Sequence, residues 1–155
     1  MDIITIELLI ASVASGTIGA FLIALYTFEH EKKKRRQELT LRYVEQFIER
    51  SDLRVEVRGI IEKTKSGDMD FLDPPGDASE AMKEFAVVNH NKVLRLSNWY
   101  KTIDTLYRDR ALDRRLYKVT GLQEAIDNFP KEIDGLPARL LTPFKEDLGD
   151  YLSID

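Results

Sequence analysis

Three aspartates gather in the stretch DMDFLD: Asp68, Asp70 and Asp73. Clustered carboxylates are ligands that hard cations such as Ca²⁺ prefer. A calcium-binding EF-hand loop also needs a third oxygen ligand, a turn glycine and a closing glutamate at fixed positions. Phe71 and Leu72 interrupt the run here. The spacing therefore predicts a solvated acidic loop, with no metal and no cofactor.

The two histidines lack the neighbours of a metal site. His90 lies in VVNHNKV, and the residues three or four positions away are Ala86, Val87, Val93 and Leu94. A helical zinc site would place a second histidine or a carboxylate there. His30 stands between two glutamates, which predicts a solvated residue. No metal ligand is predicted at either histidine.

No recognised active-site motif appears elsewhere. The chain has no cysteine, which excludes disulfides, cysteine-ligated zinc and thiol catalysis. It lacks a glycine-rich phosphate loop, a serine nucleophile elbow and an HExxH motif. We predict that the protein is not an enzyme. A membrane enzyme that uses loop carboxylates such as Asp68 and Asp70 is kept as a remaining alternative.

The stretch YRDRALDRR carries the densest charge outside the N-terminal third. Its arginines are Arg108, Arg110, Arg114 and Arg115, interleaved with Asp109 and Asp113. Arginine forks suit phosphate groups, but alternating signs favour a solvated face or a protein contact. The four arginines are our candidate contact surface for a protein partner.

Charge is unevenly distributed along the 155 residues, whose net charge is −4. Residues 1–28 contain no Lys or Arg, residues 32–42 contain six against one Glu, and residues 43–155 contain 17 Lys/Arg against 22 Asp/Glu. A nucleic-acid binder spreads positive charge over a folded face. Because only this collar, of the three segments, has a net positive charge, we predict no nucleic-acid partner.

The collar follows an apolar run. Leu8–Phe28 is 21 residues long and has no charged side chain; as a helix it would span about 30 Å, the thickness of a bilayer core. A signal peptide would begin with basic residues and have a shorter apolar core, and a buried soluble helix of this length would carry a charge. The pattern predicts one transmembrane helix.

Charge also sets the orientation. Basic flanks stay in the cytoplasm, so we predict an inner (plasma) membrane protein with its N-terminus outside and its C-terminal domain in the cytosol. The collar residues would contact anionic lipid headgroups. They are Lys32, Lys33, Lys34, Arg35 and Arg36.

Small residues recur every four positions within the span. One row is Ser12, Gly16 and Ala20, and the other is Ala11, Ser15 and Gly19. Such rows let helix backbones approach closely in lipid, although small residues are also common in spans. We take Ser12, Gly16, Gly19 and Ala20 as the candidate helix-packing face, for another subunit or for a second copy.

The rest of the chain reads as helices, which predicts an all-α fold: a transmembrane helix that continues into a stalk, then a cytosolic bundle of three or four helices. We expect helix ends near Ser51, Gly67, Arg108 and Pro130. The second helix carries a predicted apolar stripe of Leu53, Val57, Ile60 and Ile61. The third carries a predicted apolar stripe that places Trp99 in the core, with Met82, Phe85, Val88, Leu96, Ile103 and Leu106. Ser51 or Asp52, Asp77 or Ser79, and Thr120 are the expected N-caps. The predicted divisions are an anchor (1–28), a basic stalk (29–50), a helical domain (51–136) and an irregular tail (137–155).

The segments EFAVVNHNKVLRLS and LYRDRALDRRLYK, behind a single span and a basic stalk, resemble a group of uncharacterised bacterial and phage membrane proteins. These have one N-terminal span and a cytosolic helical domain of unknown function. The resemblance implies a prokaryotic or phage origin and an inner-membrane location. It implies no catalytic residue.

The predicted function is that of an accessory, anchoring or regulatory subunit of a membrane protein complex, acting through helix–helix contacts. The alternative is a self-assembling membrane effector, a pore-forming homo-oligomer of the phage or defence type. Both need a bilayer with anionic headgroups, and they differ in whether the partner is another subunit or the same chain.

Overall fold

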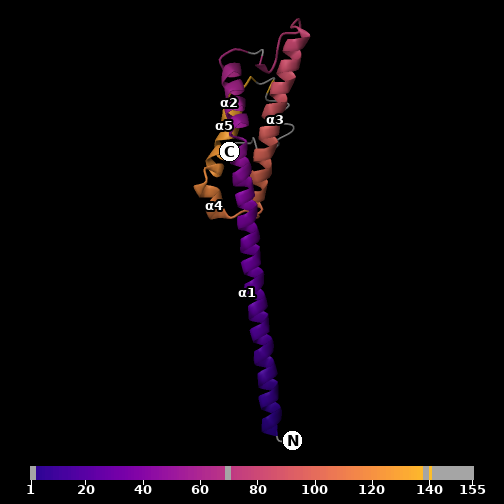
Figure 1. Cartoon of the computed structure of the whole chain (residues 1–155), viewed down its shortest axis with the longest axis vertical. Coiled ribbons are helices and arrows are strands. Elements are labelled where there is room, and N and C mark those ends of the chain that lie inside the picture. Colours follow the sequence, from indigo (N-terminus) through magenta and orange to yellow (C-terminus); the bar gives the residue numbers. More distant parts are fainter. Residues whose placement is uncertain (1–2, 69–70, 138–139, 141–155) are drawn as a thin grey trace. The chain divides into compact units, whose positions relative to one another are not determined.

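The described part of the chain is all-α, as predicted. A computed structural model describes residues 3–68, 71–137 and 140, with side chains from residue 19 onward. These residues form five α-helices and no strand. The helices in Figure 1 are α1 (Ile3–Glu49), α2 (Ser51–Lys65), α3 (Glu80–Arg108), α4 (Arg114–Val119) and α5 (Leu122–Asp134).

The chain divides into two compact units between Glu38 and Leu39. We call residues 1–38 the N-terminal unit and residues 39–155 the C-terminal unit. The division falls within α1, which contributes to both. The last turns of α1, which the sequence placed in a separate stalk, belong to the C-terminal unit because Leu39, Tyr43 and Phe47 pack against its core.

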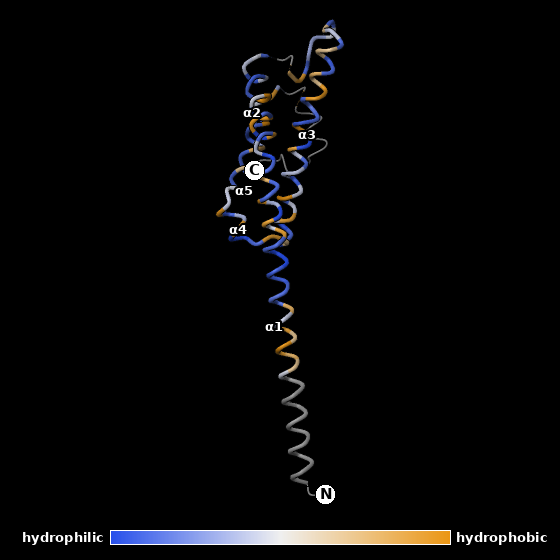
Figure 2. The backbone as a smooth tube through the Cα atoms, in the orientation of Figure 1, coloured by the Kyte–Doolittle hydropathy of each residue, from blue (hydrophilic) through white to orange (hydrophobic). Residues whose placement is uncertain are grey.

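The described side chains of the N-terminal unit change from apolar to basic along α1 (Figure 2). Six large apolar side chains are 46–73% exposed: Phe21, Leu22, Ile23, Leu25, Tyr26 and Phe28. Residues 8–18 of the predicted span have helical backbones, but their side chains lie outside the described residues. Among the described residues, no helix combines the length and the apolar character that crossing a bilayer requires.

The core of the C-terminal unit lies between α2, α3 and α5. The predicted apolar stripe of α2 is confirmed, since Val57, Ile60 and Ile61 are buried. Other buried side chains come from α3, α4 and α5 and from the segment after α5: Val93, Leu96, Ile103, Tyr117, Leu122, Ile126, Phe129, Ile133, Leu136 and Leu140. Residues 141–155, where the sequence predicted most of an irregular tail, lie outside the described residues.

Trp99 of α3 joins the last turns of α1 to this core. Its ring stacks on Phe47 with centroids 6.4 Å apart, and its Nε1 donates a hydrogen bond to Gln46 Oε1 at 3.0 Å. The Arg50 guanidinium lies over the Trp99 ring, 5.3 Å from its centroid. The prediction that Trp99 is a core residue is confirmed, and its polar atom is satisfied, as a buried indole requires.

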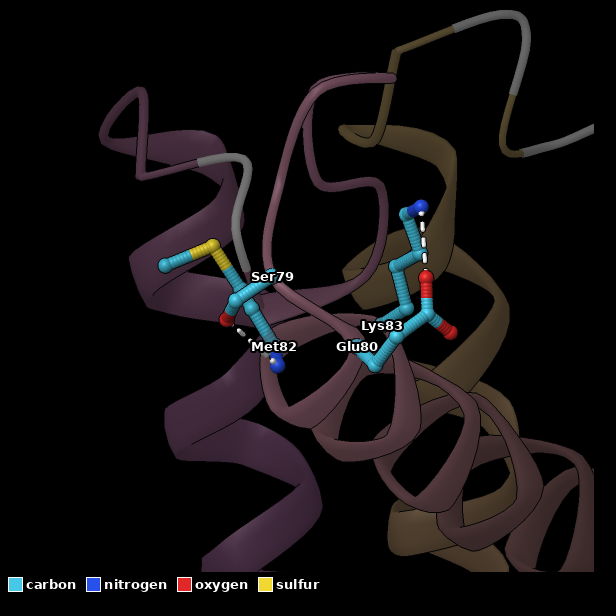
Figure 3. A network of polar contacts seen from close by, with 4 residues as sticks. All are labelled: Ser79, Glu80, Met82 and Lys83. Atoms are coloured by element: carbon cyan, nitrogen blue, oxygen red, sulfur yellow. Dashed lines mark hydrogen bonds and ion pairs between the residues drawn. The ribbon is translucent and has the colours of Figure 1, made fainter.

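Two helix ends form as the sequence predicts. After α2, Gly67 adopts φ 99, its N–H bonds Thr64 O, and Asp68 N–H bonds Lys63 O. This is a Schellman motif, in which glycine takes the left-handed position without strain. At the start of α3, the Ser79 hydroxyl accepts from Met82 N at 3.3 Å, and Glu80 pairs with Lys83 (Figure 3).

Three predicted boundaries are wrong. The N-cap of α2 is Arg50 and not Ser51, and no side chain caps it. Backbone bonds continue through this junction, from Arg50 N to Gln46 O and from Arg54 N to Arg50 O. Arg50 thus links the two helices, because its N–H bonds a carbonyl of α1 and its own carbonyl accepts from the first turn of α2.

The N-cap of α5 is Gly121, in the left-handed region (φ 73), and not Thr120. The Thr120 hydroxyl instead donates to Tyr117 O, which ends α4. α5 also continues through Pro130 to Asp134. A proline within a helix costs about 3 kcal/mol, which burial of Phe129, Pro130 and Ile133 offsets.

The first half of α3 presents a different face from the predicted one. Met82, Phe85 and Val88 are at least one-third exposed, whereas Ala86, Asn89 and Val93 are buried. The loop before α3 decides this, because Asn89 Nδ2 donates to Phe71 O at 3.1 Å. The loop thus covers the polar Asn89, and the apolar side chains of Met82, Phe85 and Val88 remain exposed.

Thr40 fixes the loop between α3 and α4 to α1. Its side chain is completely buried, and its hydroxyl accepts a hydrogen bond from Asp113 N at 2.8 Å. Replacement of the hydroxyl by a methyl of similar size would leave that N–H without this partner in a dry site.

We therefore expect Thr40→Val to lower the free energy of unfolding by about 1–3 kcal/mol. The measurement is chemical denaturation of the full chain in mild detergent, followed by fluorescence of the only tryptophan. Thr102→Val is the matched control, because Thr102 is an exposed helical threonine whose hydroxyl bonds only within its own helix; it should change stability by less than about 0.5 kcal/mol. Equal stability of the two variants would contradict the assignment of these turns to the C-terminal unit.

Candidate functional site

A cleft of about 350 Å³ opens on the C-terminal unit between the end of α1, α2, α3 and α5. Its apolar wall includes Phe47, Leu96 and Ala125. Its polar groups come from α2, α3 and α5: Arg54, Arg58, Tyr100, Glu124, Asn128 and Glu132. A cleft with an apolar wall and a few convergent polar groups is the usual form of a binding site.

Arg54 is the most constrained cation in the cleft. Its guanidinium lies 3.6 Å from the Phe47 ring centroid and donates to the Tyr100 hydroxyl. Its Nε is buried and has no hydrogen-bond partner among the described residues. A buried donor without an acceptor is costly, so this atom favours a ligand that supplies an oxygen.

Arg58 stands one turn further along α2 and reaches α5. Its guanidinium pairs with Glu132 at 3.0 Å, with side chains 64% and 30% exposed. Because this pair is open to solvent, it contributes little to stability. It can exchange partners with an incoming carboxylate or amide at small cost.

Tyr100 stays neutral under ordinary conditions. Burial raises its pKa to about 12, against the opposing effect of Arg54. Burial also raises the pKa of Tyr117, with nearby carboxylates of Asp127 and Asp104 acting in the same direction. Neither phenol is tuned toward neutral pH, as a general acid or base would be. The cleft can hold a polar group by hydrogen bonds.

A second, more apolar cleft of about 320 Å³ lies between the loop before α3 and the first half of that helix. His90 lines it beside Leu72 and Pro74. Among the described residues no cluster of His, Asp or Glu could hold a metal ion. Of the acidic loop, Asp68 and Asp73 are described and Asp70 lies outside the described residues.

Of the residues predicted to contact the membrane or to pack the span, some have described side chains and others do not. Ser12 and Gly16 lie outside the residues with described side chains. A Cβ added at Gly19 would meet nothing within 4 Å, and Ala20 is exposed. In the collar, Lys32, Lys33, Lys34 and Arg35 are exposed and Arg36 is half-buried.

The four predicted arginines do not act alike. Arg108 pairs with Asp104 at 2.7 Å. Arg110 has φ 58, in the left-handed region, and Arg114 lies 5.9 Å from the Tyr107 ring centroid. Arg110, Arg114 and Arg115 are exposed, and none of the four lines either cleft.

No pattern in the sequence predicts the Arg54–Tyr100 cleft. Arg54 and Arg58 are spaced one helical turn apart beside the buried stripe of α2, which is a detectable pattern. This spacing does not indicate that Tyr100 and Glu132 face the same space, because they follow Arg54 by 46 and 78 positions. Only the packing of three helices brings these groups together.

No protein-family model, curated protein or solved structure matches the chain. The resemblance to uncharacterised single-span bacterial and phage proteins therefore stays a prediction.

The raised pKa of Tyr100 has a measurable consequence. An unfolded tyrosine titrates near pH 10, while the folded Tyr100 has a pKa of about 12. The neutral form is favoured by folding, so this stabilisation is complete below pH 10 and is lost as the pH rises toward 12.

We expect the free energy of unfolding of the wild-type protein to fall by about 2 kcal/mol more than that of Tyr100→Phe across this window. The measurement is denaturant unfolding at a series of alkaline pH values. Parallel pH profiles for the two proteins would show that Tyr100 titrates as an unperturbed phenol.

Proposed function

We propose that this chain is a single-pass inner-membrane protein that acts as an accessory, anchoring or regulatory subunit of a membrane complex. The observation that carries the proposal is the charge-free run Leu8–Phe28, followed at once by the collar Lys32–Arg36. The backbone is helical from Ile3 to Glu49, through both segments.

Exposed apolar side chains support the anchor. Residues 21–28 cover two helical turns without a charge, and their large apolar groups occupy more than half of the helix circumference. A helix that is apolar all round belongs in a protein core or in lipid. Nothing in the described residues covers these side chains, so lipid or a partner's helix would have to do so.

The C-terminal unit supports a binding role over a catalytic one. Its cleft offers Arg54, Arg58 and Asn128 beside the exposed Val55. This mixture of arginine and apolar surface is typical of protein contacts. The shifted titratable groups of the unit are explained by burial and do not form an acid–base pair.

The absence of cysteine allows a direct topology test. We expect Asp2→Cys to react with a membrane-impermeant maleimide in intact cells, because the N-terminus faces outward. Ser66→Cys, at the end of α2, should react only after the cells are permeabilised. Labelling of position 66 in intact cells would reverse the orientation, and recovery of the protein in the soluble fraction would refute the anchor.

The small-residue face predicts how the span associates. Gly16→Leu with Gly19→Leu should lower recovery of the intact assembly about tenfold, because loss of close helix packing in lipid costs ~1–2 kcal/mol. The measurement is the mass and composition of the tagged assembly extracted in mild detergent. Ala14→Leu is the control, since the helical period places it opposite Gly16.

Composition of that assembly separates the two functions that remain open. Other membrane proteins at a fixed ratio would establish an accessory subunit. A pure homo-oligomer would instead favour the self-assembling effector, which should also conduct ions in a planar bilayer. Unchanged recovery of the glycine double variant would refute the packing face in either case.

A further inference from the structure

Four cations project from the turn between α3 and α4 and from α4 itself. They are Arg110, Arg114, Arg115 and Lys118, and we call them the basic end of the C-terminal unit. All four are exposed. Among the described residues none of them forms an ion pair.

The acidic side chains near the basic end have other partners or are too few to neutralise its charge. Asp104 holds Arg108 at 2.7 Å. The Asp113 carboxylate caps α4, where it accepts from Arg115 N and Leu116 N at 3.0 Å each. Residues 108–118 contain five Lys/Arg against two Asp, whereas residues 43–155 as a whole are acidic. The basic end is therefore a local positive surface on an acidic unit.

The backbone that carries these cations is firmly held. Leu112 is 2% exposed, and Tyr107 stacks on Tyr117 with centroids 4.2 Å apart. The backbone positions of the four cations are thus fixed before any partner arrives, so binding has to order only their side chains.

Arg110 occupies a strained position. α3 ends with a Schellman motif, in which Arg110 N–H bonds Tyr107 O and Ala111 N–H bonds Leu106 O. α2 ends with the same motif, and there the left-handed residue is Gly67. Glycine is the unstrained choice, so an arginine at φ 58 is a local outlier that points to a use for its charge.

A hydrogen bond ties the basic end to residues that follow the collar closely in the sequence. Asp113 N donates to Thr40 Oγ1 at 2.8 Å, and Thr40 follows Arg36 by four residues. Four residues span at most about 14 Å. The length of the chain therefore allows the basic end to reach a surface that the collar contacts.

We propose that the basic end binds anionic lipid headgroups, so that the C-terminal unit lies against the same leaflet as the collar. This inference rests on the proposed membrane anchor. Arginine forks match phosphate oxygens, and clustered cations beside a span are attracted to anionic leaflets. A protein partner is the competing outcome of the test, because arginine is also enriched in protein interfaces.

The test uses the full chain in vesicles. Val119, next to Lys118, is 72% exposed, so Val119→Cys gives a single site for a fluorescent label in a cysteine-free protein. Ser66→Cys is the comparison site, because α2 ends at the opposite end of the C-terminal unit from α4 (Figure 1). The vesicles contain phosphatidylcholine alone or with about 30 mol% phosphatidylglycerol, plus a headgroup-linked quencher.

We expect the label at position 119 to be quenched about threefold more strongly in the anionic vesicles than in the neutral ones. The difference should disappear in about 0.5 M salt and in the triple variant Arg110→Gln, Arg114→Gln, Arg115→Gln. The label at position 66 should report no difference. A control variant that removes the same charge elsewhere, Lys65→Gln, Arg95→Gln, Lys131→Gln, should behave as the wild type does.

Each other outcome has a distinct meaning. Quenching at position 119 that is equal in both vesicles, or unchanged in the triple variant, overturns the proposal. If the triple variant keeps its quenching but loses partner subunits from the purified assembly, the arginines contact protein and the proposal is again overturned. A wild-type chain that does not float with vesicles of either composition refutes the anchor itself, which is a separate result.

Discussion

The contact between Trp99 and the last turns of α1 is the interaction on which the C-terminal unit depends. The Trp99 ring packs against Phe47 of α1 and against Tyr100 of α3, and its Nε1–H donates to Gln46 Oε1. Together with the Thr40–Asp113 hydrogen bond, this contact holds the last turns of α1 against the core, from which the chain continues into α2. The same contact places Phe47 under Arg54, which forms one wall of the cleft. A single aromatic residue thus connects the stalk, the core and the candidate site.

Arginines perform three different tasks within this small unit. The charges of Arg58 and Arg108 are neutralised by the carboxylates of Glu132 and Asp104. Arg54 is held by an aromatic face and a phenol and keeps one buried donor without a partner. Arg110, Arg114 and Arg115 are exposed and have no ion-pair partner among the described residues. The side chain is the same, but burial and the nearest acid decide whether it stabilises the fold or awaits a ligand.

Helix termini show where local sequence rules succeed. Ser79 and Gly67 act as predicted because their effect needs only neighbouring backbone groups. Ser51 and Thr120 fail as N-caps because other groups take part: the Arg50 carbonyl accepts from the first turn of α2, and the Thr120 hydroxyl donates to Tyr117 O of α4. Pro130 is tolerated because its neighbours are buried. A local motif is thus reliable only where no other partner competes for the same atoms.

The sequence by itself determined the helical class, the ends of α3, the buried stripe of α2 and the order of apolar and basic segments along α1. These follow from periodicity and from charge, which act over a few residues. Only the tertiary structure decided that Thr40 to Phe47 belong to the C-terminal unit, that the first half of α3 buries Asn89, and that Arg54, Tyr100 and Glu132 share a cleft. The physical reason is range: each of these depends on groups from 18 to 78 positions apart in the sequence, whose contact no short pattern encodes.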